Sequence, residues 1–111
     1  MPLAFWICAA VTAISAAVSF GYSVAGLRGS DPGSRTPSQY AVARSLALVV
    51  VAAIAPFTGS VAFLTAVAAA MVIVQAADAV VGALRGDRFR TFGPAATAAG
   101  NLGALVWLLL T

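Results

Sequence analysis

The chain contains stretches of uncharged sequence that are too long to form single helices. Between Arg44 and Arg85 lie forty residues that include one charged side chain, Asp78. As one helix this run would be ~60 Å long, about twice the ~30 Å hydrocarbon core of a bilayer. We therefore expect it to fold back on itself, and the turn signal within it is the segment 56–60. Residues 1–27 form a second uncharged stretch that is long enough to span a membrane.

The composition indicates that lipid, rather than water, is the solvent of this chain. Hydrophobic residues make up 62% of the sequence and charged residues 8%, whereas a soluble domain carries about 25% charged residues. A soluble domain of this size could not bury so much apolar surface. We predict an all-α polytopic membrane protein with a single integral membrane domain, 1–111. Its four-transmembrane-helix bundle would consist of helices at about 3–27, 37–57, 61–84 and 94–111.

Turn and capping signals set these helix boundaries. Residues 30–33, with the sequence Ser-Asp-Pro-Gly, predict a turn. Thr36 and Gln39 have the spacing of a capping box, which predicts Thr36 as the N-cap and Pro37 as the first helical residue of the second helix. Gly93-Pro94 predicts the start of the fourth helix after a short polar loop.

The arginines predict how the bundle is oriented. The charged residues are six Arg and three Asp, without Lys, Glu or His. Four helices place the loops 28–36 and 85–90 on the same side, and all six arginines then belong to that side. The positive-inside rule predicts that both loops are cytoplasmic and that the N-terminus and C-terminus lie outside. The predicted location is therefore the bacterial plasma membrane.

Several classes of function are excluded by the residue inventory. Without histidine, and with Cys8 as the only cysteine, the chain is not expected to bind zinc, haem or an iron–sulfur cluster, and no metal or cofactor is predicted. A Ser-His-Asp or Cys-His nucleophile is excluded as well. The arginines lie in loops instead of forming a basic stripe, so nucleic acid is not an expected partner. We expect Cys8 to be a small apolar filler.

Asp78 is the first candidate for a functional residue. A charged side chain at the centre of a membrane helix costs about 2.5–3.5 kcal/mol on insertion scales, so it is expected to face the bundle interior, a partner or water. Arg44 is its natural partner because both residues lie at a similar depth from the same side. Gln75 shares the helical face of Asp78, and Met71 continues that face outward. Either the pair only fixes helix packing, or Asp78 serves a proton, a ligand or a substrate.

Polar residues of the first and fourth helices are candidates for the same site. Ser15, Ser19 and Tyr22 recur at helical spacing on one face of the first helix, and Thr97 and Asn101 share a face of the fourth. Such residues either hold helices together or line a polar cavity. If these faces converge, the catalytic candidates are Asp78, Arg44, Tyr22 and Asn101. The binding candidates are then Gln75, Ser15, Ser19, Thr97 and Met71.

A ridge of small residues lies on the other face of the fourth helix. Ala95, Ala99 and Gly103 form this ridge, which predicts a closely packed neighbouring helix, either in the same bundle or in a second copy of the chain. The expected partners are therefore membrane lipid, an apolar small-molecule ligand and a homo-oligomer formed through the ridge.

Residues 40–111 resemble those of a known group of proteins. Ala77-Asp78, Gly82, Arg85-Gly86 and Gly93-Pro94-Ala95 are similar to the pattern of the DoxX-like small bacterial membrane proteins and their relatives of unknown function. The resemblance implies a four-helix bundle but no agreed activity. Small multidrug-resistance transporters match in size and helix number, but they depend on a Glu in the first helix, and this chain has no Glu.

The sequence leaves three functions open. In the first, the protein binds or transforms an apolar small molecule by acid/base chemistry at Asp78, while Arg44, Tyr22 and Asn101 position its polar end. In the second, it is a proton-coupled small transporter in which Asp78 titrates. In the third, it is an accessory or structural subunit. A pocket closed to the outside favours the first, a continuous pore the second, and the absence of a cavity around Asp78 the third.

Overall fold

The structure is a computed structural model that describes residues 2–111, and it is all-helical, as predicted. A short 3₁₀ helix, η1, connects the second and third of four α-helices within these residues. All four helical segments are long and apolar enough to cross a membrane. The elements are α1 (Leu3–Arg28), α2 (Arg35–Ile54), η1 (Ala55–Thr58), α3 (Val61–Leu84) and α4 (Arg88–Leu110).

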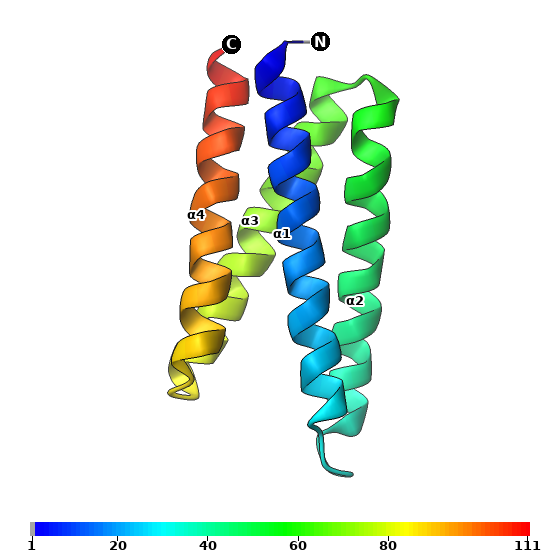
Figure 1. Ribbon diagram of the computed structural model, residues 1–111, viewed down its shortest axis with the longest axis vertical. Helices are drawn as coiled ribbons and strands as arrows, with labels where there is room; N and C mark the ends of the chain where they lie inside the picture. The colour runs from blue at the N-terminus through cyan, green and yellow to red at the C-terminus, as the bar shows by residue number, and fades with distance from the viewer. Residues whose placement is uncertain (1) are drawn as a thin grey trace.

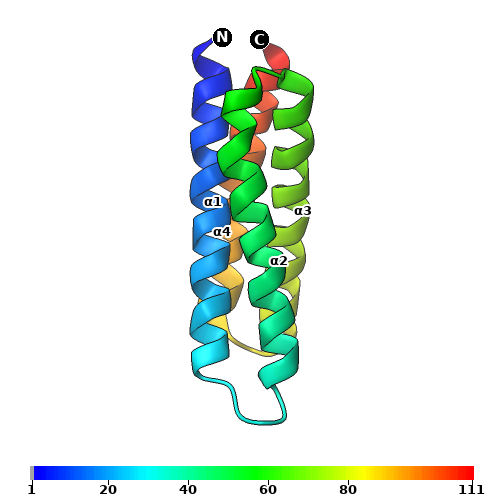
Figure 2. The ribbon, with the colours of Figure 1, turned by 90° about the vertical axis from the view of Figure 1, so that its right-hand side faces the viewer.

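The helices run up and down along the 47 Å long axis of the molecule (Figures 1 and 2). Both ends of the chain and the α2–α3 turn lie at one end, here called the termini end. The α1–α2 and α3–α4 loops lie at the opposite end, the loop end. The arginines belong to the loop end or, in the case of Arg44, to the half of α2 nearest it.

The boundaries of α3 agree with the predicted range 61–84 because both of its ends carry strong local signals. Ser60 is the N-cap, and its Oγ accepts a hydrogen bond from the backbone N–H of Phe63 at 3.1 Å. At the other end Gly86 has a φ of 69°, which glycine adopts without a steric penalty. This conformation lets the N–H of Asp87 reach the carbonyl of Gly82 at 3.0 Å, as in a Schellman motif.

The predicted start of the second helix is wrong by two residues. α2 begins at Arg35 after the N-cap Ser34, so Thr36 and Pro37 lie within its first turn and the predicted capping box is not formed. The cause is the preceding turn, in which the N–H of Ser34 donates to Asp31 Oδ1 at 2.9 Å and the chain enters the helix earlier. Proline is tolerated there because the first-turn N–H groups have no partner within the helix. The predicted end at residue 57 lies inside η1.

The predicted start of the fourth helix is wrong by six residues. α4 begins at Arg88, so Pro94 lies inside it and the predicted 85–90 loop is shorter. Asp87 overrides the proline signal by acting as N-cap: its Oδ1 accepts from the N–H of Arg90 at 3.1 Å. Pro94 removes one helical donor, the one that would reach the carbonyl of Arg90 four residues earlier.

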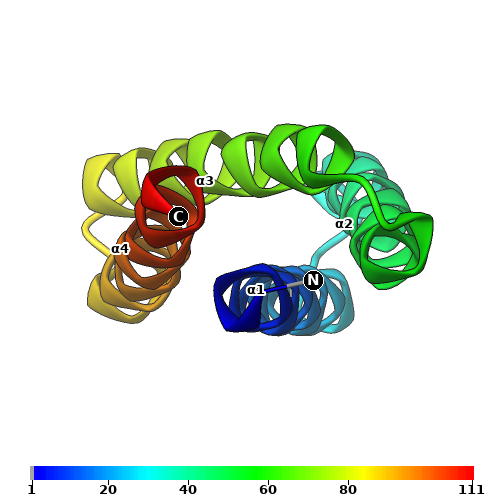
Figure 3. The same ribbon diagram turned by 90° about the horizontal axis from the view of Figure 1, so that it is seen from above.

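The apolar core fills the termini half of the bundle. Its residues are mostly small or aliphatic, which allows the four helices to approach closely. Toward the loop end, α1 stays beside α2 and α3 stays beside α4, while the two pairs diverge (Figures 1 and 3). The core consists of Ala4, Phe5, Cys8, Ala9, Ala16, Ala52, Ala55, Leu64, Val67, Ala68, Met71, Ala104, Leu105 and Leu108.

The small-residue ridge of α4 faces outward. Ala99 and Gly103 are exposed and Ala95 is half-buried. The ridge therefore does not form the close contact within the bundle, and contact with a second copy stays a prediction.

Gly82 instead marks the closest approach between α3 and α4. A Cβ placed on Gly82 would lie 2.5 Å from the carbonyl oxygen of Arg90, in the first turn of α4. Because the obstructing atom is backbone, it cannot rotate away as a side chain would. Glycine is therefore required at this point for α4 to fold back along α3.

We expect Gly82→Ala to lower the free energy of unfolding by about 1–3 kcal/mol, as overpacking does. Gly100→Ala is the matched control, since a Cβ at Gly100 meets nothing within 4 Å. This control should be neutral or more stable by up to ~1 kcal/mol, because alanine is the better helix former. Reversible unfolding in detergent micelles measures both. Equal effects of the two substitutions would contradict the close approach.

Candidate functional site

Where the two helix pairs diverge, they enclose a cleft of approximately 800 Å³ that is lined by all four helices. One wall, from α1, α2 and their loop, is rich in hydroxyl groups. The other, from α3 and α4, is charged. The polar lining residues are Ser19, Tyr22, Ser23, Ser30, Ser34, Ser38, Arg44, Gln75, Asp78, Arg85, Asp87 and Arg90.

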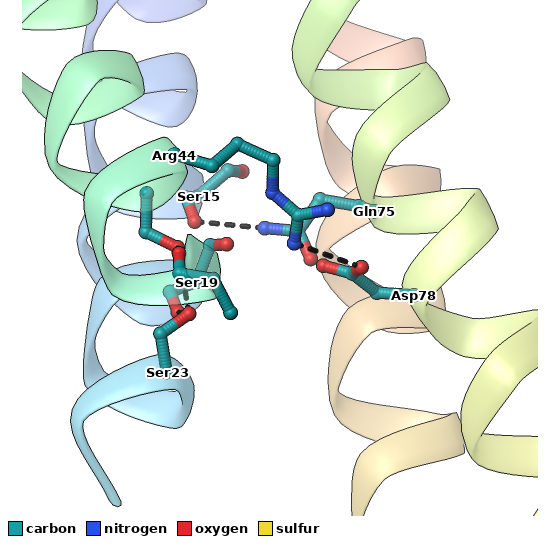
Figure 4. A network of polar contacts seen from close by, with 8 residues as sticks. Ser15, Ser19, Ser23, Arg44, Gln75 and Asp78 are labelled. Carbon is teal, nitrogen blue, oxygen red and sulfur yellow. Dashed lines mark hydrogen bonds and ion pairs between the residues drawn. The ribbon is translucent and has the colours of Figure 1, made fainter. Parts of the chain in front are cut away.

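An ion pair links α2 to α3 across this cleft. Arg44 Nη2 donates to Asp78 Oδ1 at 3.2 Å (Figure 4). The Arg44 side chain is 51% exposed and that of Asp78 30%, so the pair borders open space instead of being packed between helices. The partnership expected from the sequence is present, but its two members are not buried.

Gln75 forms the floor of the cleft. Its Nε2 donates to the backbone carbonyl of Ser15 at 2.8 Å, and its side chain is buried (Figure 4). This bond connects α3 to α1 at the level where the apolar core ends. The Ser15 side chain is itself buried and does not line the cleft.

Ser19 lies beside this floor with an unsatisfied hydroxyl. In a helix, a serine hydroxyl commonly donates to the carbonyl four residues earlier, which here is the Ser15 carbonyl already used by Gln75. The Ser19 side chain is 3% exposed and lines the cleft, and its Oγ has no hydrogen-bond partner among residues 2–111. A buried polar atom without a partner is costly, and it is therefore a feature that calls for a ligand or water.

Tyr22 and Arg90 close the side of the cleft between α1 and α4. The Tyr22 hydroxyl donates to the carbonyl of Phe89 at 3.3 Å, and the two rings lie 5.0 Å apart. The same hydroxyl contacts Gly93, where a side chain would collide with it. The Arg90 guanidinium lies against Gly26 on α1. Tyr22 therefore lines the cleft but is not bonded to Asp78.

Four of the predicted site residues have side chains that lie away from the cleft, and the first of them, Ser15, is described above. Asn101 is fully buried, and its Nδ2 donates to Thr12 Oγ1 at 3.0 Å, which ties α4 to α1 in the core half. The Thr97 hydroxyl is used by carbonyls of its own helix, and Met71 belongs to the apolar core. The structure therefore brings together Asp78, Arg44, Tyr22, Gln75 and Ser19, but not Asn101, Thr97, Met71 or the Ser15 side chain.

The cleft also has a cationic part that is not among the residues predicted from the sequence. The arginine pattern indicates Arg85 and Arg90 only as orientation signals, yet both line the cleft. For Arg85 a signal was present, because Gln75, Asp78, Gly82 and Arg85 follow the spacing of one helical face. For Arg90 no such signal existed, since its position depends on the unexpected start of α4.

The arrangement offers one carboxylate and one guanidinium at the same point of a polar cleft. The carboxylate can accept or donate a proton, and the guanidinium can stabilise negative charge that develops beside it. Among residues 2–111, no three His, Cys, Asp or Glu side chains are grouped so that they could hold a metal ion.

We expect the Arg44–Asp78 pair to contribute little to stability, because it is partly exposed. The coupling energy from a double-mutant cycle of Asp78→Asn and Arg44→Gln should be about 0.2–1 kcal/mol, typical of exposed pairs. A buried pair would instead lose about 3–5 kcal/mol on removal of one partner. Unfolding of the two single variants and the double variant in micelles gives the coupling energy. If either single variant instead lost about 3–5 kcal/mol of unfolding free energy, the pair would be enclosed.

Comparisons of this chain with protein-family models, with curated proteins and with solved structures found no match. The resemblance to the DoxX-like group stays a prediction.

Proposed function

We propose that this chain is an integral membrane protein that binds a small molecule in the cleft between its two helix pairs. In this proposal Asp78 and Arg44 act on the polar end of that molecule by acid/base chemistry. The apolar remainder of the molecule would lie along Ala41, Val81 and Pro94, which line the same cleft.

The observation that carries the proposal is the position of the ion pair. A pair that only fixed helix packing would be expected between closely packed helices, with its remaining polar atoms satisfied by protein. Instead, Asp78 and Arg44 share one hydrogen bond and border a cleft of approximately 800 Å³. Ligand pockets typically have volumes of about 300–1,000 Å³.

The direction in which the cleft opens supports a binding role. The termini half is filled by Phe5, Leu64, Met71 and other core residues, so the cleft is closed on that side and opens at the loop end. By the positive-inside rule the α1–α2 and α3–α4 loops would be cytoplasmic. The ligand would then enter from the cytoplasm or from the inner half of the bilayer.

In the proposed chemistry, Asp78 is the proton-transfer group. Its carboxylate removes a proton from the bound molecule, and Arg44 stabilises the negative charge left behind. Gln75 stays bonded to the Ser15 carbonyl and keeps the floor of the cleft in place beneath the reacting atoms.

The accessory-subunit function is the second candidate, and one observation favours it. Several polar residues serve to join helices: Asn101 bonds Thr12, and Ser23 Oγ lies 2.6 Å from Ser45 Oγ on α2. These bonds account for much of the polarity of the core half without any ligand. They do not account for the exposed ion pair or for the Ser19 hydroxyl.

The test of the proposal is to fill the cleft. Ala41 lines it, whereas Ala43 on the same helix is exposed outside it, so Ala41→Trp and Ala43→Trp form a matched pair. Native mass spectrometry of protein purified from its membrane should show a bound small molecule in the wild type and in Ala43→Trp. The same species should be missing from Ala41→Trp.

If the wild type, Ala41→Trp and Ala43→Trp all carried the same bound species, or if none of them did, ligand binding in the cleft would be contradicted. Asp78→Asn should retain the bound molecule, because Asp78 is proposed to act on it and not to be its main anchor.

A further inference from the structure

The charges of the cleft do not cancel. Both carboxylates that line it are already engaged by a cation: Asp78 by Arg44 at 3.2 Å, and Asp87 by Arg90, whose Nε lies 3.5 Å from Asp87 Oδ2. The third lining guanidinium, that of Arg85, forms no ion pair with any residue of 2–111. The lining therefore carries one uncompensated positive charge.

Asp87 is also held by the backbone. Its Oδ1 accepts from the N–H of Arg90 and its Oδ2 faces the Arg90 side chain, so both oxygens of Asp87 already have a partner.

A second group deeper in the cleft also lacks a partner. The buried Ser19 hydroxyl has no partner among residues 2–111, and the carbonyl four residues before it already accepts from Gln75. Ser19 is nine residues from the end of α1, which corresponds to ~13 Å along the helix. A ligand that satisfies both groups would be elongated, with one end at Arg85 and hydrogen-bonding atoms near Ser19.

We propose that the ligand of the cleft carries a phosphate group, which binds at Arg85, the unpaired guanidinium of the lining. Guanidinium groups bind phosphate with paired, charge-assisted hydrogen bonds. Asp78 lies seven residues before Arg85, ~10 Å away along α3, so the phosphate would anchor the molecule at the mouth of the cleft and present its other end to Asp78. This inference rests on the proposed binding function. The phosphate would belong either to a soluble molecule or to a lipid headgroup.

The test compares Arg85→Gln with Arg28→Gln. Both arginines are exposed residues at the C-terminal end of a helix at the loop end, but only Arg85 lines the cleft. Inorganic phosphate is titrated against each protein at constant ionic strength, and binding is followed by the midpoint of thermal unfolding. A parallel arm uses nanodiscs of phosphatidylcholine with and without phosphatidic acid.

We expect the wild type and Arg28→Gln to be stabilised alike, and Arg85→Gln to bind the phosphate group at least about tenfold more weakly, as expected for a lost hydrogen bond between charged groups. Stabilisation by inorganic phosphate shows that the site accepts a soluble phosphate, and stabilisation by phosphatidic acid alone shows that it takes the phosphate of a lipid headgroup only. No stabilisation in either arm, or equal losses in Arg85→Gln and Arg28→Gln, overturns the inference. The cleft-filling comparison of Ala41→Trp with Ala43→Trp does not depend on phosphate. If Ala41→Trp loses the bound molecule while phosphate stabilises neither arm, only the phosphate inference is refuted and ligand binding in the cleft stands.

Discussion

The hydrogen bond from Gln75 to the backbone carbonyl of Ser15 separates the two halves of this bundle. On its termini side, small and aliphatic residues of all four helices pack into one core. On its loop side the α1–α2 pair and the α3–α4 pair diverge, and side chains instead of helix contacts span the gap. Arg44 and Asp78 bridge one side of the cleft, and Tyr22 bridges the other.

The same bond links packing to the chemistry of the site. Gln75 uses the Ser15 carbonyl, and the Ser19 hydroxyl one turn further along α1 has no partner among residues 2–111. Because the helix pairs diverge beyond Gln75, the Arg44–Asp78 pair borders a cleft and keeps polar atoms free for another molecule.

The helices could be predicted from sequence where local signals and chain length agreed. As one helix, the forty-residue run between Arg44 and Arg85 would be twice the thickness of the bilayer core, so it required a turn, and the segment 56–60 supplied the turn signal. In the structure Ser60 caps the start of α3 and Gly86 follows its end. The start of α4 was predicted six residues late because Gly93-Pro94 is a strong local signal for a helix start, with proline in the first turn. The N-cap at Asp87 outweighs that signal once α4 packs against Gly82.

The site could be predicted only in part, for a geometric reason. Helical periodicity shows which residues share a face, and it correctly grouped Gln75 with Asp78. It does not show where along the bundle two faces separate. Asn101 and Met71 therefore belong to the packed half, although their faces point inward as expected, whereas Arg85 reaches the cleft from the loop end.

If the two helix pairs are packed at the termini end and separated at the loop end, the spacing between α1 and α3 must widen toward the loop end (Figures 1 and 3). Distances between spin labels on α1 and α3, measured by double electron–electron resonance in lipid nanodiscs, test it directly. In a Cys8→Ala background, one pair of labels at Ala25 and Leu84 reports on the loop end, and another at Leu3 and Ala62 reports on the termini end. We expect the Ala25–Leu84 distance to be clearly longer than the Leu3–Ala62 distance. Equal distances would indicate a parallel bundle without a cleft and would contradict the account.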